Sequence, residues 1–158
     1  RLPGASGVVP RETTDPAQFS ELVAEIAPGF AVAESGVGGV AIVAEHQARA
    51  GVLRTHPVSR DKACIMTRIV ALPADRKSRL LVDVSRDTRG DWRLLVVGNG
   101  ERLLDEMISP ESTKEGWVSY HVDLSKFAGR EVKLQLFNQA NDWNHEFGYW
   151  GRVALETE

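Results

Sequence analysis

The sequence predicts an all-β domain, an antiparallel jelly-roll β-sandwich of about eight to nine strands with one short N-terminal helix. Short segments with strand character recur at roughly even spacing from residue 40 to the end, and turn residues separate them. The gaps are too short for the crossover helices that a parallel sheet requires. Because 158 residues fit one domain, we expect residues 1–14 to be a tail or linker and residues 15–158 to be a single sandwich domain.

The first expected element is a helix. Residues 1–14 contain Pro and Gly without periodicity. Asp15 then suits the N-cap and Pro16 the first helical position. Apolar residues follow at helical spacing, namely Phe19, Leu22, Val23 and Ile26. Because Pro28-Gly29 ends the pattern, we expect a short amphipathic helix that packs its apolar face on the domain.

Strand patterns follow from residue 40. Val40–Ala44 is a short apolar run, and eight further segments read as strands: Gly51–Thr55, Cys64–Leu72, Arg79–Ser85, Trp92–Val97, Arg102–Ile108, Val118–Leu124, Val132–Phe137 and Phe147–Glu156. Asn99-Gly100 is a preferred pair for a type I′ turn, in which both residues take positive φ. Trp92–Gly98 and Glu101–Ile108 are therefore predicted to be adjacent antiparallel strands.

Composition narrows the classes of function. The net charge of −3 argues against a nucleic-acid partner, which favours a basic face. No apolar run approaches the length needed to span a membrane. The single cysteine, Cys64, lies in an apolar strand segment and is interpreted as a core residue. Because the chain begins with Arg1, we expect a fragment or processed form of a longer protein.

Several segments of the second half occur in a familiar order. They are Gly90–Val96, Trp117–Gly129 with its Asp-Leu-Ser-x-x-Ala-Gly motif, Val132–Leu136 and Glu146–Leu155. This order resembles the galactose-binding-like β-sandwiches, a group that includes many carbohydrate-binding modules. The motif itself is explained by turn chemistry, since Asp123 and Ser125 can bond nearby amides and Gly129 allows positive φ.

The resemblance, which covers about residues 50–156, implies a function. It implies a non-catalytic accessory module that binds a polysaccharide or oligosaccharide through loop aromatics and polar side chains. It also implies a neighbouring domain in a larger secreted protein, located outside the cell, at its surface or in the periplasm. A structural calcium is implied as well, with Glu34, Asp142 and Glu156 as candidate ligands, and no other cofactor is expected.

Aromatic and polar residues gather near the C-terminus. Three of the six Trp and Tyr residues, Trp143, Tyr149 and Trp150, fall within eight positions. An aromatic ring can pack on the C–H face of a sugar while polar side chains bond its hydroxyls. We predict a ligand-binding site formed by Asn141, Asp142, Trp143, Asn144, His145 and Glu146, with Asp91 and Trp92 beside it. Trp117 and Trp150 occupy strand positions and are expected in the core.

An enzyme is the main alternative, either a jelly-roll polysaccharide lyase or a glycoside hydrolase. A lyase needs a group that neutralises a uronate and a Tyr or His that carries the proton. Tyr120 and His121, with Lys133, Gln135 and Asn138 on the next strand, are the set of this kind. Sequence neighbours on a strand point to opposite faces, so Tyr120 and His121 cannot share one groove. No carboxylate pair stands out for a hydrolase. A purely structural or protein-interaction domain is the third class.

Overall fold

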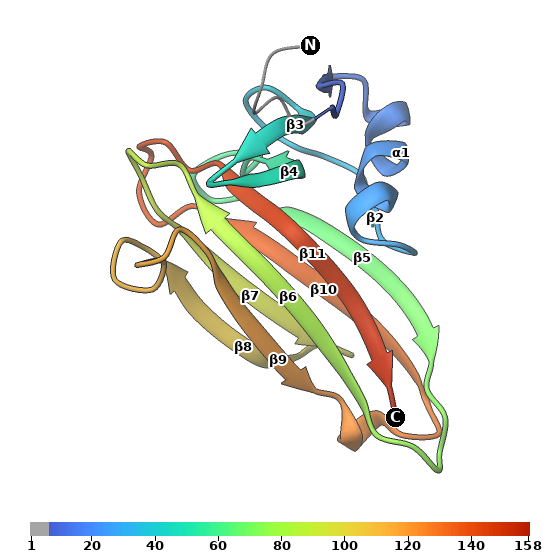
Figure 1. Ribbon diagram of the computed structural model, residues 1–158. Coiled ribbons are helices and arrows are strands. Elements are labelled where there is room, and N and C mark those ends of the chain that lie inside the picture. Colours follow the sequence, from blue (N-terminus) through green and yellow to red (C-terminus); the bar gives the residue numbers. More distant parts are fainter. Residues whose placement is uncertain (1–6) are drawn as a thin grey trace.

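The computed structural model describes residues 7–158, which form two antiparallel sheets packed face to face with one helix beside them (Figure 1). One sheet has the strand order β1-β3-β4-β11-β6-β9 and the other β2-β5-β10-β7-β8. The strands are β1 (Arg11–Thr13), β2 (Ala31–Val32), β3 (Val40–His46), β4 (Arg49–Thr55), β5 (Cys64–Ala71), β6 (Ser78–Arg86), β7 (Trp92–Gly98), β8 (Glu101–Ile108), β9 (Val118–Asp123), β10 (Glu131–Gln139) and β11 (Gly148–Thr157). The predicted antiparallel sandwich is confirmed.

Helix α1 (Pro16–Ile26) begins and packs as its sequence indicates. The Asp15 carboxylate accepts the N–H of Ala17 at 3.0 Å, and Pro16 occupies the first turn. The buried face carries Phe19, Leu22 and Val23. This face lies against β2 of one sheet and against β3 and β4 of the other, so the helix closes one edge of the sandwich (Figure 1).

The Asn99-Gly100 turn joins β7 and β8 as predicted. Asn99 has φ +47° and Gly100 φ +80°, and the two strands pair antiparallel from Gly98 with Glu101 to Trp92 with Ile108. The Asp-Leu-Ser turn also follows its predicted chemistry, since Asp123 accepts the amide of Ser125 at 2.9 Å. The short 3₁₀ helix η1 (Ser125–Phe127) follows it.

Part of the expected N-terminal tail is ordered into the sheet. Residues 11–13 form β1 and pair with β3, from Arg11 with Ile42 to Thr13 with Val40. The Arg11 guanidinium also binds the Glu25 carboxylate of α1 at 2.6 Å. A three-residue edge strand has no room for periodicity, so its pattern could not indicate it. The part of the tail prediction that concerns residues 1–6 lies outside the described residues.

The core lies between the two sheets. Trp92 and Trp150 are fully buried there, with ring centroids 5.2 Å apart, and Cys64 is buried as expected. Desolvation raises the pKa of the Cys64 thiol to about 12. The expectation for Trp117 was wrong: this ring is half-buried outside the core, beneath the guanidinium of Arg49 at 4.5 Å. Trp117 immediately precedes β9, so the alternation of side chains along that strand does not determine which face of the sheet the indole takes.

Pairing between β6 and β11 brings two loops to the same end of the sandwich. Gly148, the first residue of β11, pairs with Arg86, the last of β6. On the other sheet, Gln139 at the end of β10 pairs with Arg93 near the start of β7. The β6–β7 loop (residues 87–91) and the β10–β11 loop (residues 140–147) therefore cross between the sheets side by side (Figure 1).

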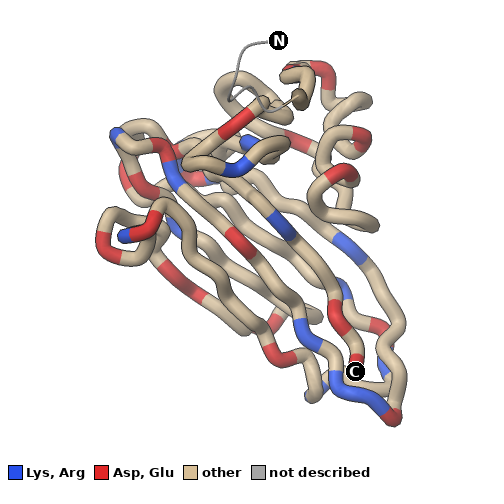
Figure 2. The backbone as a smooth tube through the Cα atoms, viewed as in Figure 1, with Lys and Arg blue, Asp and Glu red and all other residues tan. Residues whose placement is uncertain are grey.

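Charged residues are spread over the strands and loops, with both signs intermingled (Figure 2). No helix among residues 7–158 has the length and apolarity to cross a membrane. Because charges of both signs intermingle along the backbone of residues 7–158, a ligand site is sought in local geometry.

Candidate ligand-binding site

The β10–β11 loop is organised around Glu146. This side chain is fully buried, and its Oε1 accepts the amides of Asn141 at 2.6 Å and Asp142 at 3.1 Å. Asp142 in turn accepts the amide of Asn144 at 3.1 Å. The other Glu146 oxygen, Oε2, is buried without a hydrogen-bond partner. Burial, reinforced by the nearby Asp142 carboxyl, raises the pKa of Glu146 to about 7.

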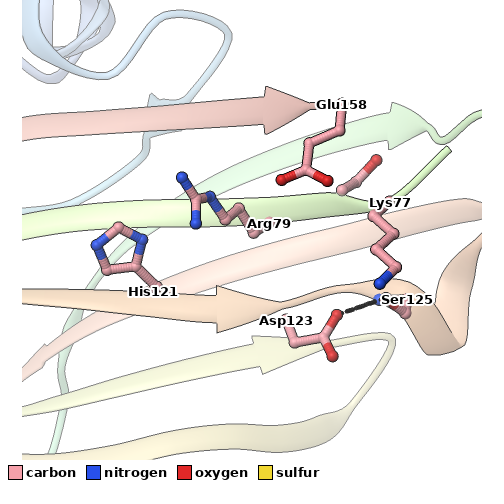
Figure 3. A pocket seen from close by; sticks show the side chains of 7 residues that line it. Lys77, Arg79, His121, Asp123, Ser125 and Glu158 are labelled. Atoms are coloured by element: carbon pink, nitrogen blue, oxygen red, sulfur yellow. Dashed lines mark hydrogen bonds between the residues drawn. The ribbon is translucent and has the colours of Figure 1, made fainter.

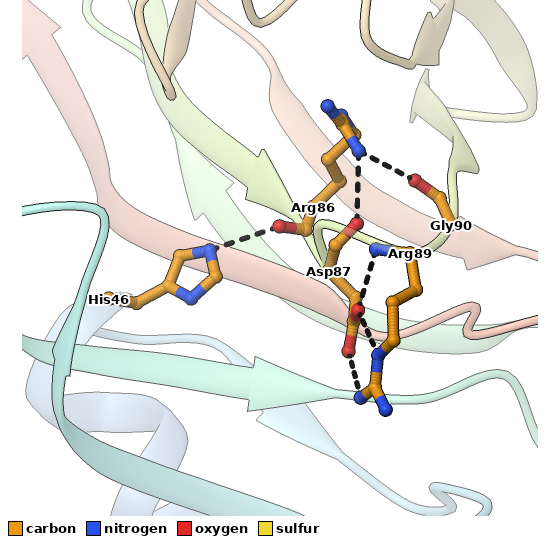
Figure 4. Close-up of polar contacts among 5 residues, drawn as sticks. All are labelled: His46, Arg86, Asp87, Arg89 and Gly90. Atoms are coloured by element: carbon orange, nitrogen blue, oxygen red, sulfur yellow. Dashed lines mark hydrogen bonds and ion pairs between the residues drawn. The ribbon is translucent and has the colours of Figure 1, made fainter.

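The β6–β7 loop is held by Arg86, Asp87 and Arg89 (Figure 4). The Arg89 side chain donates to both Asp87 oxygens at 3.0 and 2.9 Å, and these bonds lower the pKa of Asp87. Arg86 donates to the carbonyls of Asp87 at 3.1 Å and Gly90 at 3.2 Å, while His46 contacts the Arg86 carbonyl at 3.0 Å. The Arg89 side chain stays 65% exposed, so the loop presents a guanidinium whose position is fixed in advance.

The two loops pack directly on each other at Gly90. A Cβ atom at this glycine would lie 2.3 Å from the carbonyl oxygen of His145 and 2.5 Å from that of Asn144. The side-chain amide of Asn141 also donates to the Asp91 carboxylate of the other loop at 3.3 Å. The predicted grouping of Asp91 with the 141–146 loop is therefore present in the structure.

Two hollows flank the β6–β7 loop. One of about 220 Å³ is lined by Arg86, Thr88, Arg89, Gly90, Asp91, Pro110, Asp142 and Asn144. The other, of about 300 Å³, is lined by His46, Gln47, Asp87, Thr88, Arg89 and Tyr149. Thr88 and Arg89 belong to both, so the hollows adjoin. We call the pair the loop groove. Its lining includes both hydrogen-bond donors and hydrogen-bond acceptors.

Trp143 is the exposed tryptophan of the β10–β11 loop. Its side chain is 38% exposed and meets His56 edge-on, with ring centroids 5.2 Å apart and an interplanar angle of 85°. His56 is itself buried against Phe147 at 4.8 Å. The contact holds the indole against the buried His56 ring, and part of Trp143 stays exposed to solvent. Trp143 is not among the lining residues of the loop groove.

Two residues of the predicted site do not face a ligand. Trp92 is fully buried and donates its Nε1–H to the carbonyl of Ser85 at 2.9 Å. Its inclusion was therefore wrong, because the alternation of β7 directs it into the core. Glu146 is also fully buried and serves the loop backbone. Asn141, Asp142 and Asn144 are exposed, and His145 is half-buried with φ +55°.

Sequence patterns missed a group of rings at the other side of the loop groove. The ring of His46 stacks on Tyr149 with centroids 3.6 Å apart and nearly parallel planes, and it meets Trp117 edge-on at 6.0 Å. Arg49 covers Trp117 and binds Asp83 at 3.1 Å. The neighbouring order β3-β4-β11-β6-β9 in one sheet unites these residues from four distant segments, so no local motif could have revealed them.

A larger hollow of about 320 Å³ lies at the opposite end, lined by residues that include Lys77, Arg79, His121 and Asp123 (Figure 3). Arg79 is paired with Glu156 at 3.1 Å, and Asp123 is bonded to Ser125. It has no Trp or Tyr in its lining. It is therefore a weaker candidate for a sugar than the loop groove, despite its size.

The residues considered for a lyase do not assemble. Tyr120 packs against the core, while the exposed His121 lines the distant hollow. β9 and β10 belong to different sheets, so Lys133 and Gln135 are not on an adjacent strand. Asn138 is buried and donates to Thr55 at 3.0 Å.

The first set of calcium ligands does not assemble either. Glu156 pairs with Arg79 eight residues along β11 from Gly148, roughly 26 Å away at the usual strand rise. Asp142 lies just before that strand begins. Glu34 is paired with Lys62 at 2.6 Å. Three carboxylates do converge elsewhere, since Asp91, Asp142 and Glu146 offer oxygens within 4.8 Å of one another.

Comparison with solved structures identifies the fold. The xylan-binding CBM22-1 domain of Paenibacillus barcinonensis Xyn10C superposes with a TM-score of 0.53 at 13% identity, covering 94% of this chain and 92% of that one. The family 61 module TmCBM61, in complex with β-1,4-galactotriose, gives 0.53 at 15% identity, covering 94% and 99%. The chain has the β-sandwich fold of these carbohydrate-binding modules.

The fold also occurs in proteins of other kinds. A cyclase from Fischerella sp. TAU has a TM-score of 0.52 at 13% identity, covering 82% of this chain and 74% of that one. An uncharacterized protein from Archaeoglobus fulgidus is 28% identical over 120 residues, which cover 66% of this chain. The chain spans only 30% of that relative's length. No family model matches the chain. The structural superpositions establish the fold and leave the function to the site.

Proposed function

We propose that this chain is a non-catalytic carbohydrate-binding domain of a larger protein that acts outside the cell, at its surface or in the periplasm. The observation that carries the proposal is the exposed Trp143 on the loop that also lines a polar groove with Asp142 and Asn144. An aromatic face beside convergent hydrogen-bonding groups suits a sugar, whose rings have both apolar and hydroxylated sides. The shared fold with carbohydrate-binding modules supports the same proposal.

The groove has the groups that a sugar needs for orientation. The Arg89 guanidinium is anchored to Asp87 and still exposed, so it can donate to ring or hydroxyl oxygens at little further cost in side-chain entropy. Asp91, Asp142 and Asn144 supply acceptors and an amide in the hollow that Arg89 also lines. Trp143 does not line the groove, but it lies between Asp142 and Asn144 in the sequence and would add apolar contact to a sugar that extends beyond the groove. In this proposal binding depends on both loops together.

The test is retention by a panel of soluble polysaccharides in affinity gels, with affinities measured by calorimetry on oligosaccharides of the retained class. Trp143→Ala should weaken binding by about 10-fold or more, because the lost aromatic contact is worth about 1.4 kcal/mol. Ile69→Ala is the matched control, since Ile69 is 60% exposed on β5, away from the loops. It should bind as the unmodified chain does.

Three other outcomes would contradict the proposed site or the proposed class of protein. Unchanged affinity in Trp143→Ala would contradict the site. Failure of every polysaccharide to retain the chain would favour a structural or protein-interaction domain. Release of reducing ends by the isolated chain would favour the polysaccharide lyase or glycoside hydrolase.

A further inference from the structure

We propose that Asp91, Asp142 and Glu146 form a Ca²⁺ site that joins the β6–β7 loop to the β10–β11 loop. Their carboxylate oxygens lie within 4.8 Å of one another. An ion held at 2.3–2.6 Å from its ligands keeps those ligands within about 5 Å of each other. The three oxygens can therefore contact one ion after small side-chain movements. Asp91 and Asp142 also line the loop groove, but Ca²⁺ binding is measured without sugar, so the failure of one proposal is distinguishable from the failure of the other.

A second observation points to a ligand in this cluster. Glu146 is fully buried and its Oε2 has no hydrogen-bond partner, although Oε1 accepts two amides. A buried carboxylate oxygen without a donor is unfavourable unless a cation or a proton satisfies it. Among residues 7–158 none of the three carboxylates takes part in an ion pair within 4.0 Å, unlike Asp83, Asp87 and Asp105. No cationic side chain among residues 7–158 thus neutralises the three carboxylates, and a bound cation would do so.

The chemistry of the cluster favours calcium. All three ligands are oxygens, which hard cations prefer and which do not select zinc or copper. The cluster passes from buried Glu146 through half-buried Asp91 to exposed Asp142, so water can complete a coordination shell of six to eight oxygens on the open side. Asp91 is held only by long contacts to the Asn141 amide, at 3.3 and 3.4 Å, and is free to turn toward an ion. Mg²⁺ would demand a stricter octahedron than loop carboxylates provide.

The experiment is calorimetric titration of the intact chain with CaCl₂ after dialysis against EGTA, together with thermal unfolding in each condition. We expect one Ca²⁺ per chain and a rise in Tm of about 5 °C at saturating Ca²⁺. Asp142→Asn and Glu146→Gln should each weaken Ca²⁺ binding at least about 10-fold. Asp75→Asn removes an exposed acid in the β5–β6 loop at the far end and should bind as the unmodified chain does.

Glu146→Gln also gives a readout that a purely structural carboxyl would not. In EGTA near neutral pH the variant should unfold at a higher temperature than the unmodified chain, because it removes a buried charge. With Ca²⁺ the order should reverse. The absence of a Ca²⁺ effect on the unmodified chain would overturn the proposal, as would equal Ca²⁺ affinity in Asp142→Asn and the unmodified chain. If Glu146→Gln fails to fold, Asp91→Asn replaces it as the second variant.

Discussion

At the scale of single residues, Glu146 shows how one side chain can organise a loop and still carry an electrostatic cost. Its Oε1 accepts the amides of Asn141 and Asp142, which fixes the start of the β10–β11 loop. Its burial without a cation raises its pKa to about 7 from the ordinary value of 4.5. In the absence of a bound ion, the folded state therefore holds a proton that the unfolded chain releases at lower pH.

This shift predicts the pH dependence of stability in EGTA. Between pH 4.5 and about 7 the folded chain binds more protons at Glu146 than the unfolded chain, so the free energy of unfolding falls as the pH rises. The contribution amounts to about 3 kcal/mol over that range, at 1.36 kcal/mol for each pH unit. Glu146→Gln keeps the amide acceptor and should remove this slope. Urea unfolding at several pH values measures it.

Two histidines have the opposite effect on the pH dependence of stability, so the prediction for Glu146 is made as a difference between two chains. Desolvation lowers the pKa of His46 and of His56 from 6.5, so their contribution to stability is lost as the pH falls through 6.5 and below. The difference between the unmodified chain and Glu146→Gln cancels their effect. That difference should be small at pH 5 and should favour the variant above pH 7. A difference independent of pH would contradict the assignment.

Residue patterns predicted this site only in part. A polar loop around Trp143 could be identified because its composition is local, but the sequence could not decide whether the ring is exposed or folds down to cap the sandwich. The burial of Glu146 could not be foreseen, since it depends on two amides of its own loop and on the packing of β6–β7. Trp92 was misassigned because the first residue of a strand can face either way until its partners are known.

At the scale of elements, the contact of the two loops depends on Gly90. A side chain there would approach the carbonyls of His145 and Asn144 to 2.3 and 2.5 Å, and these are backbone atoms that cannot rotate away. Gly90→Ala should therefore separate the loops and lower the free energy of unfolding by about 1–3 kcal/mol. Thr88→Ala, at an exposed position in the same loop, is the control and should have little effect.

Hydrogen exchange measures which amides lose protection in Gly90→Ala. The amides of Asn141 and Asp142, which bond Glu146, should exchange faster in Gly90→Ala, while amides within β10 and β11 keep their protection. Uniform acceleration through both sheets would mean that the loops are coupled to global unfolding, contrary to this prediction. Equal exchange in the variant and the unmodified chain would show that the loops do not depend on close packing at Gly90.

At the scale of the whole molecule, the sequence could predict the positions of β3 to β11, because each is a local pattern bounded by turn residues, whereas the short β1 and β2 were missed. The partition of the strands between two sheets could not be predicted. β9 and β10 are separated by a short turn yet belong to different sheets, which is why the lyase candidates at Tyr120 and Lys133 never meet. The His46–Tyr149 stack depends on the same long-range pairing. Single strands can thus be predicted from local sequence patterns, whereas the residues that share one face of a sheet can be known only from the strand order.

The two sheets are joined by a buried polar bridge just below the loop end. The Thr55 hydroxyl of β4 accepts the Asn138 amide of β10 at 3.0 Å and the indole N–H of Trp150 at 3.0 Å. All three residues are buried. Thr55→Val keeps the shape but leaves two buried donors without an acceptor, each costing about 1–3 kcal/mol. We expect a loss of about 3 kcal/mol in the free energy of unfolding, measured in urea.

Thr55→Ser separates the hydroxyl from the methyl group. It retains the acceptor for Asn138 and Trp150 and loses one buried methyl, which costs about 1 kcal/mol. The serine variant should therefore be clearly more stable than the valine variant, although valine buries more apolar surface. If valine were the more stable, apolar packing would outweigh the polar bridge in joining the sheets.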